Sequence, residues 1–343
     1  MTEPVTVAVD ANGADKGPAE VARGAALAAA AGTRVLLFGP ASEFGDTGDG
    51  VEVVDAPVSI AKDADPARAV RRTPDASIVG AVEAVAEGRA DALVSGGSTG
   101  AALAAALFRF KRPRGVHRPA LAIVVPVPKA PFLLLDAGAN VEVRPEHLVQ
   151  FAHMGAAFME AVVGVASPRV ALLANGTEPT KGTEIVVAAH QTLASSEGLN
   201  FVGNVEGFAI GTGEADVIVA DGFTGNIALK VMEGASAALL GAVRSAAMSS
   251  TRSKLGGALL RPALRGLRSE LDPEEQGGAV LLGLRRLAIV PHGSFTARGF
   301  ARAIEVAARG VREDVAGRTH ARLAAAGALR AASEAAASVP EQP

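Results

Sequence analysis

ADALVSGGSTGAALAA, at residues 90–105, is matched without gaps by ADVIVADGFTGNIALK at residues 215–230. Each copy runs from a short apolar segment through a glycine-rich turn, which predicts a strand, a tight turn and the start of a helix. The first N–H groups of a helix lack partners and carry the positive end of its dipole, so each turn is a candidate anion site. The alternative is two ordinary strand-to-helix turns in which glycine only allows positive φ.

The rest of the chain repeats this alternation of short β-branched runs and helical stretches. A predicted strand at Val5–Val9 precedes a helix over Pro18–Ala31, and one at Val170–Leu173 precedes a helix over Gly182–Ser195. The apolar segments Leu121–Val125 and Phe132–Leu135 are predicted to form a hairpin pair. Nearly continuous apolar strands are typical of a parallel sheet covered by helices on both faces, so we predict an α/β fold with a largely parallel sheet. Ligands of such sheets bind beyond the carboxyl ends of the strands, and we expect both glycine-rich turns at that one edge.

Composition excludes several classes of function. The 343 residues include no Cys, Trp or Tyr and carry a net charge of −3. Disulfides and thiolate chemistry are therefore excluded, and neither a basic footprint nor aromatic stacking indicates nucleic acid. No nucleotide motif of the form G-x-G-x-x-G or G-x-x-x-x-G-K-[ST] follows a strand. The sequence shows no signal segment and no apolar run of ~18 residues, so we expect a cytoplasmic protein without a membrane span.

Polar side chains gather in the loops that follow the predicted strands. Lys181 stands in such a loop and offers a compact charge suited to phosphate, although many loop lysines are merely solvated. The helical pair His147 and His153 is six residues apart, which does not fit metal ligands, and we predict no metal site. Capping or loop tethering is the structural alternative for the acidic members of the set. The residues expected to bind phosphate or substrate are Asp10, Asn12, Gly13, Ser98, Thr99, Gly100, Glu206, Asp221, Thr224, Gly225 and His292.

A basic segment departs from this pattern. Residues 251–269, TRSKLGGALLRPALRGLRS, contain five basic residues and no acidic one, with leucines at roughly helical spacing. This composition predicts an amphipathic element on an anionic membrane, while a grip on an acidic partner or a helical hairpin at a dimer interface stays open. Pro262 and the Gly256–Gly257 pair argue against one continuous helix. The expected membrane-facing residues are Leu255, Leu259, Leu260, Leu264 and Leu267.

The order of these motifs resembles the bacterial fatty acyl-ACP:phosphate acyltransferase (PlsX) family of phospholipid synthesis. The resemblance is carried by VDANGADKGP, DALVSGGSTGAALAAALFRF, LLDAGANVEVRPEHLVQFAHMG, PRVALLANGTEPTKG, NFVGNVEG, ADVIVADGFTGNIALK and HGS, in the family's order. It implies a three-layer αβα sandwich, related to phosphotransacetylases and to isocitrate and isopropylmalate dehydrogenases, with a protruding helical element. Residues 1–310 would form one catalytic domain of two lobes around a cleft, including a helical element at 237–275. Residues 311–343 would form a C-terminal helix and a disordered tail.

The resemblance also implies a reaction in which acyl-ACP and inorganic phosphate give acyl phosphate and free ACP, without a cofactor. Phosphate is a nucleophile near neutral pH, so positioning and charge stabilisation suffice. We assign Lys181 and the N–H groups of Ser98–Gly100 to phosphate, and Asn226 with the N–H groups of Thr224–Asn226 to the oxyanion. His292 and water both remain open as the proton source for the leaving thiol.

The expected partners are acyl carrier protein, phosphate, a second copy of the chain, and a membrane surface that holds a glycerol-3-phosphate acyltransferase. The expected location is the cytoplasm, at the inner face of the cell membrane. Alternatives are a phosphotransacetylase-like transfer from acyl-CoA, a β-decarboxylating dehydrogenase on a related fold, and a non-catalytic membrane scaffold.

Overall fold

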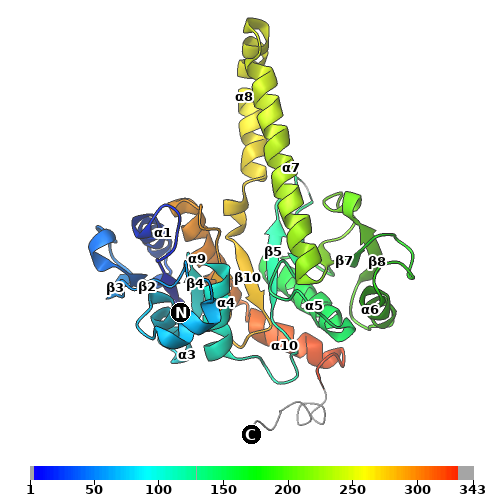
Figure 1. The fold of residues 1–343 in the computed structure, drawn as a ribbon, viewed down its shortest axis with the longest axis horizontal. Coiled ribbons are helices and arrows are strands. Elements are labelled where there is room, and N and C mark those ends of the chain that lie inside the picture. The colour runs from blue at the N-terminus through cyan, green and yellow to red at the C-terminus, as the bar shows by residue number, and fades with distance from the viewer. Residues whose placement is uncertain (1–3, 129, 331–343) are drawn as a thin grey trace.

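A single mixed sheet organises the chain (Figure 1). The computed structural model describes residues 4–128 and 130–330, except for the side chains of 267–269, and within these residues the sheet has eleven strands. Their order is β3-β2-β1-β4-β11-β10-β5-β6-β9-β7-β8. The strands are β1 (Thr6–Asp10), β2 (Arg34–Gly39), β3 (Val51–Asp55), β4 (Ala92–Ser95), β5 (Ala120–Val125), β6 (Phe132–Leu135), β7 (Val170–Ala174), β8 (Phe201–Glu206), β9 (Val217–Val219), β10 (Ala279–Leu282) and β11 (Leu287–Val290).

Helices cover both faces of this sheet, which confirms the predicted three-layer αβα sandwich. On one face lie α2 (Pro66–Arg72), α3 (Ser77–Ala86), α4 (Thr99–Phe110) and the first turns of α7 (Gly222–Met248). On the other lie α1 (Pro18–Ala30), α5 (Pro145–Phe158), α6 (Glu184–Ala194), α9 (Ala297–Arg312) and α10 (Val315–Ala325). Phe300 of α9 is fully buried. A Cβ added at Gly24 of α1 would stand 2.6 Å from the Phe300 Cβ, so these two helices pack almost backbone to backbone.

The two halves of the sheet run in opposite directions. Strand β10 is antiparallel to both β11 and β5, and β5 is antiparallel to β6, while every other neighbouring pair is parallel. Three reversals in succession leave β6, β7, β8 and β9 opposed to β1, β2, β3, β4 and β11. The carboxyl ends of β4 and β9 therefore lie at opposite edges. The expectation that both glycine-rich turns share one edge is wrong, because sequence alone did not reveal that β10 inserts between β11 and β5.

A helical hairpin projects from the body of the molecule (Figure 1). It consists of α7 and α8 (Thr251–Glu270), so the predicted element at 237–275 begins earlier, at Gly222. Helix α8 is continuous despite Pro262, since the lost hydrogen bond lies on an exposed helix where water can replace it. Gly257 favours the hairpin, because a Cβ there would stand 3.1 Å from the Ala247 Cβ of α7.

Helix α7 has the length and composition of a membrane span, although the sequence suggested no such segment. Its best 18-residue window has a mean hydropathy of 1.3, and only 6% of that window is buried inside the molecule. Its many alanines raise the hydropathy without forming an obvious run of large apolar residues. Four of the five leucines predicted to face a membrane are exposed, namely Leu255, Leu259, Leu260 and Leu264. The side chain of the fifth, Leu267, lies outside the described residues. The predicted tail beyond residue 330 also lies outside them.

Candidate active site

Asp10 organises the edge at which β1 and β4 end. Its side chain is 3% exposed, and it accepts hydrogen bonds from the Ser77 Oγ (2.6 Å), the Ser95 Oγ (2.8 Å) and the Asn12 N–H (3.3 Å). Asn12 is also buried, and its amide donates to the Ser77 Oγ and to two backbone carbonyl oxygens of the segment that follows β3. Both side chains thus shape the loop from inside, and their burial does not fit the direct substrate contact predicted for them.

Burial also changes the acidity of this carboxyl. Loss of solvation raises the pKa of Asp10 from 3.8 to about 6, against the lowering effect of its three hydrogen bonds. The loop above it is tight: a Cβ added at Gly13, which has φ +94°, would stand 2.8 Å from the Gly97 Cα. Glycine at position 13 therefore lets the first loop touch the glycine-rich turn after β4.

The turn after β4 leaves helix donors unpaired. Ser98 is the N-cap of α4, and its Oγ accepts from the Ala101 N–H at 3.1 Å. The N–H groups of Ser98, Thr99 and Gly100 form no hydrogen bond with any part of residues 4–128 and 130–330. These three donors lie at the positive end of a 12-residue helix. Such an arrangement can hold the oxygens of a phosphate.

The same turn has the spacing of a hydrolase nucleophile elbow. Gly96–Gly100 reads G-x-S-x-G. However, Ser98 has φ −72° and ψ 139°, an ordinary extended conformation rather than a strained one, and its Oγ serves as the helix cap. Across the described residues no His contacts the Ser98 hydroxyl. The geometry therefore makes Ser98 a backbone donor and cap rather than a nucleophile.

His292 joins this edge from β11, the neighbour of β4. The Asp15 N–H donates to the Gly293 carbonyl oxygen at 2.9 Å, which ties the first loop to the turn after β11. The His292 ring is exposed, and its Nδ1 lies 2.8 Å from the Ser294 Oγ. The structure thus brings together the predicted residues of the first loop, those of the first glycine-rich turn, and His292.

In the second glycine-rich turn, a carboxylate of the protein itself occupies the start of the helix. Asp221 is the N-cap of α7, and its carboxylate accepts from the N–H groups of Phe223 (3.0 Å) and Thr224 (2.8 Å) and from the Thr224 hydroxyl (2.7 Å). The Gly225 N–H donates to the Asp221 carbonyl oxygen at 2.9 Å. The oxyanion role predicted for the Thr224 and Gly225 N–H groups is therefore wrong. In the gapless alignment of the two copies, Asp221 occupies the position that Gly96 holds in the first copy.

The start of α7 rests on a loop that sequence reasoning missed. Asp136 follows β6, is fully buried, and accepts from the N–H groups of Leu121, Gly138, Ala139 and Asn140 and from the Asn140 amide, at 2.7–3.1 Å. Burial raises the pKa of Asp136, which these bonds oppose. A Cβ at Gly225 would stand 2.0 Å from the Asp136 carbonyl oxygen, so this approach requires glycine. The sequence feature that could have indicated this loop is Asp136 in LLDAGAN, which directly follows a predicted strand.

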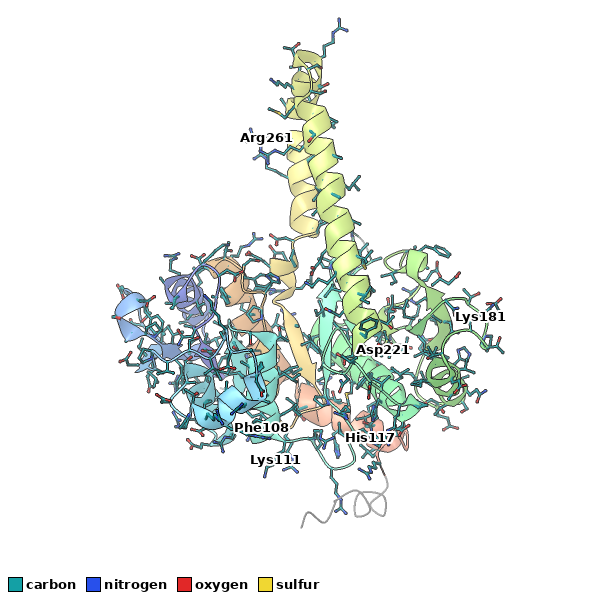
Figure 2. All side chains as sticks on the ribbon, in the orientation of Figure 1. Phe108, Lys111, His117, Lys181, Asp221 and Arg261 are labelled. Carbon is teal, nitrogen blue, oxygen red and sulfur yellow. The ribbon has the colours of Figure 1, made fainter. Side chains whose placement is uncertain are left out.

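Asn226 faces this loop, while Lys181 lies farther out. A Cβ added at Gly138 would stand 3.8 Å from the Asn226 Oδ1. Figure 2 shows Lys181 at the outer margin of the molecule, whereas Asp221 lies at the base of α7. The Lys181 stem packs over Gly176, where an added Cβ would stand 2.6 Å from the Lys181 Cγ. Glu206, half-buried, ends β8 beside β7 at the same edge.

The candidate residues thus form two groups. Five strand-to-strand steps separate β4 from β9, which is about 24 Å at ~4.8 Å per step. One phosphate cannot contact both the Ser98–Gly100 turn and Asn226 of the same chain. Neither of two cavities outlined by the structure is lined by Lys181 or Asn226. Among the described residues, no group of three or more His, Asp and Glu side chains could hold a metal ion.

Solved structures with this fold include two phosphotransacetylases. The phosphotransacetylase from Streptococcus pyogenes superimposes with a TM-score of 0.62 at 17% identity, over 91% of this chain and 95% of its own. The EutD phosphotransacetylase from Staphylococcus aureus gives a TM-score of 0.59 at 18% identity, over 90% of this chain and 94% of its own. At these identities the likeness shows the fold alone, and it confirms the predicted relation to phosphotransacetylases.

Sequence relatives are much more similar. A family model described as "Fatty acid synthesis protein" matches residues 5–318. The phosphate acyltransferase of Pelotomaculum thermopropionicum is 45% identical over 312 residues, which cover 89% of this chain and 91% of that protein. The phosphate acyltransferase of Geobacillus thermodenitrificans is 42% identical over 93% of this chain and 99% of its own. The chain therefore belongs to the PlsX family of bacterial phosphate acyltransferases and is an acyltransferase.

Proposed function

We propose that the enzyme transfers a fatty acyl group from acyl carrier protein to inorganic phosphate, and that the acyl phosphate enters phospholipid synthesis. The observation that carries the proposal is the set of unpaired N–H groups at Ser98, Thr99 and Gly100 in a member of the phosphate acyltransferase family. An acyltransferase that accepts a bare anion needs such donors, because phosphate offers only oxygens to hold.

The proposed chemistry needs no covalent enzyme intermediate. A phosphate oxygen attacks the thioester carbon, and the carbonyl electrons move to its oxygen. The resulting tetrahedral oxyanion collapses with cleavage of the C–S bond, which leaves acyl phosphate and a thiolate. The thiolate takes a proton from water or from His292, which follows β11, the parallel neighbour of β4. Positioning and charge stabilisation supply most of the rate.

Lys181 and Asn226 lie at the other edge of the sheet, so their proposed roles require a second copy of the chain. We propose a homodimer in which Lys181 and Asn226 of one protomer complete the phosphate turn of its partner. The exposed apolar side chains of α7, including Leu239, Leu240 and Val243, offer a surface that a second hairpin can cover. A two-fold axis would complete two such sites at once.

A backbone substitution tests the phosphate turn. Thr99 is the first helical residue after the Ser98 cap, a position that proline favours, and the conformation of Ser98 suits a following proline. Thr99→Pro therefore removes one N–H donor and keeps the helix. With acyl-ACP as donor and acyl phosphate detected by phosphorus NMR, we expect the KM for phosphate to rise about tenfold, the loss of ~1.4 kcal/mol of binding. Thr99→Ala, which keeps the N–H, is the control, and equal KM values in the two variants would reject the site.

A mixed dimer tests the shared site. Asn226→Ala should lower turnover by ~10²–10³, the usual effect of a lost oxyanion donor, and Lys181→Ala should act similarly. If sites are shared between protomers, a heterodimer of Thr99→Pro and Asn226→Ala holds one site with no substitution and, at phosphate well below its KM, recovers up to half of the wild-type activity. No recovery in the purified heterodimer would show that each site belongs to one chain.

The hairpin is proposed to bind an anionic membrane at the inner face of the cell membrane, where a glycerol-3-phosphate acyltransferase would use the product. The Leu259 side chain is 77% exposed near basic residues of α8. Leu259→Glu should abolish flotation with anionic liposomes and leave activity with soluble substrate unchanged. Equal flotation of variant and parent would remove the membrane proposal. Parallel assays with acyl-CoA separate the carrier-protein donor from the phosphotransacetylase-like alternative.

A further inference from the structure

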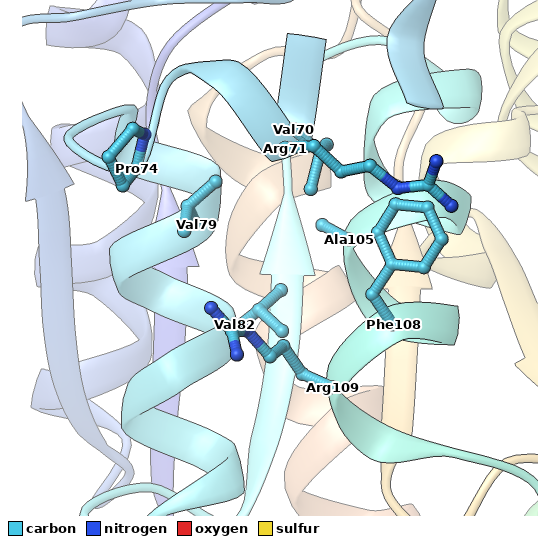
Figure 3. A pocket seen from close by; sticks show the side chains of 8 residues that line it. All are labelled: Val70, Arg71, Pro74, Val79, Val82, Ala105, Phe108 and Arg109. Atoms are coloured by element: carbon cyan, nitrogen blue, oxygen red, sulfur yellow. The ribbon is translucent and has the colours of Figure 1, made fainter. Parts of the chain in front are cut away.

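A small cavity lies on the face of the molecule formed by α2, α3 and α4 (Figure 3). Its volume is about 270 Å³, and its apolar lining includes Val70, Val79, Val82 and Ala105. Phe108 stands at its rim with 36% of its side chain exposed. A cavity of this size can take one or two apolar side chains of a partner, which is the usual anchor of a protein interface.

Two guanidinium groups flank this cavity. The Arg71 guanidinium carbon lies 4.5 Å from the centre of the Phe108 ring, a cation–π contact that leaves the charge exposed. Arg109, on the other side, forms an ion pair with Glu83 at 2.6 Å. Figure 3 shows Arg71 over Phe108 and Arg109 reaching toward α3. The apolar cavity therefore has a cationic rim on the side of Arg71, while Glu83 neutralises Arg109 on the other.

The surrounding sequence concentrates positive charge. Residues 66–72 contain three Arg and residues 99–118 contain five Lys or Arg, and neither segment contains an Asp or Glu, although the whole chain carries −3. The charges are close enough to repel one another: burial, followed by repulsion from Arg118 and Arg330, lowers the pKa of Arg112. A surface of one sign attracts a partner of the opposite sign and steers its approach.

The position of this surface relates it to the reacting groups. Phe108 lies ten residues beyond Ser98 on α4, which is about 15 Å at ~1.5 Å per residue. The segment 111–118, which contains four of these basic residues, then runs to β5. The Pro119 carbonyl oxygen accepts from the Asn140 amide at 2.7 Å, in the loop that supports α7. The surface thus begins one helix length from the phosphate turn, within reach of a long flexible arm.

We infer that this surface, defined by Arg71, Arg72, Phe108, Lys111 and the cavity beside them, docks the acidic carrier protein that brings the acyl group. The inference rests on the proposed function, which supplies a protein-bound thioester. Carboxylates of the carrier lie against Arg71, Arg72 and Lys111, and an apolar side chain enters the cavity beside Phe108. A membrane is the less suitable occupant, because the surface is concave and lies at the opposite end from the hairpin (Figure 2).

Binding of a carrier without substrate tests this inference apart from catalysis. Full-length enzyme is titrated with apo acyl carrier protein, which bears no thiol arm, by calorimetry at low salt. Arg71→Glu/Lys111→Glu should weaken binding at least tenfold, and Phe108→Ala should weaken it severalfold. Arg261→Glu is the matched control, since it reverses an exposed cation on α8 and should leave binding unchanged. Circular dichroism verifies that each variant is folded.

A kinetic measurement separates this surface from the reacting site. In Arg71→Glu/Lys111→Glu the KM for acyl-ACP should rise about tenfold, while the kcat and the rate with a small acyl thioester stay unchanged. Unchanged carrier affinity, loss of affinity only in Arg261→Glu, or loss of liposome binding in Arg71→Glu/Lys111→Glu would overturn the inference. If parent enzyme binds apo carrier at this surface but makes no acyl phosphate, the docking surface stands and the proposed reaction fails.

Discussion

Replacing Asp10 by Asn should change how the stability of the enzyme depends on pH. The pKa of Asp10 is 3.8 in a solvated chain and about 6 in the folded one. Between these values the folded chain binds a proton that the unfolded chain has released, so the free energy of unfolding falls as pH rises. At about 1.4 kcal/mol per pKa unit the full effect is about 3 kcal/mol, of which about 2 kcal/mol develops between pH 4.5 and 7.

The measurement is urea unfolding of wild type and Asp10→Asn at several pH values, and the quantity of interest is their difference. Relative to the variant, wild type should lose about 2 kcal/mol as pH rises from 4.5 to 7. Asp216→Asn is the control. Hydrogen bonds and the charge of Arg169 hold the pKa of Asp216 below its usual range, so its contribution is present above pH 4 and lost only in stronger acid. If the difference in the free energy of unfolding between wild type and Asp10→Asn stays constant with pH, the reasoning is refuted.

Three further substitutions test the packing of the site and core. Gly225→Ala should lower turnover at least tenfold, because the new Cβ meets the Asp136 carbonyl oxygen. The control is Gly234→Ala, in open space on the same helix, which should keep activity and raise the free energy of unfolding by about 0.5–1 kcal/mol. Asp136→Ala should cost at least about 3 kcal/mol in urea unfolding, since four backbone N–H groups lose their acceptor. Phe300→Ala should cost about 3–5 kcal/mol by the same measurement, and a smaller loss would mean that α1 and α9 collapse into the space.

Local patterns predicted the strands and helices well, because each is set by nearby residues. The apolar segments Leu121–Val125 and Phe132–Leu135 form the expected antiparallel pair, and both glycine-rich turns lead from a strand into a helix. The direction of the second half of the sheet was not predictable, since it depends on where β10 inserts. That strand lies more than 140 residues from its partner β5 in sequence, and its apolar pattern does not specify a neighbour.

The candidate residues were predicted more successfully than their arrangement. Lys181 and His292 stand in loops after strands and Asn226 stands near the start of α7, as expected, but they lie at two edges of the sheet. Asp10 was identified for its position after the predicted strand Val5–Val9 and is the last residue of β1. Its buried carboxylate accepts a hydrogen bond from Ser77, a partner that no local pattern indicates. The capping role of Asp221 was predictable in principle, because Asp is a strong N-cap when it directly precedes the first residue of a helix.

The two helix starts should differ in how they respond to phosphate. Asp221 neutralises the beginning of α7 permanently, so that end of the helix gains nothing from a dissolved anion. The beginning of α4 has no such built-in counter-charge, and its order is coupled to the concentration of a solute. Amide exchange at Thr99 and Gly100 should therefore slow when phosphate is added, while exchange at Phe223 and Thr224 stays the same. The start of α7 therefore serves as an internal control for anion binding at the start of α4.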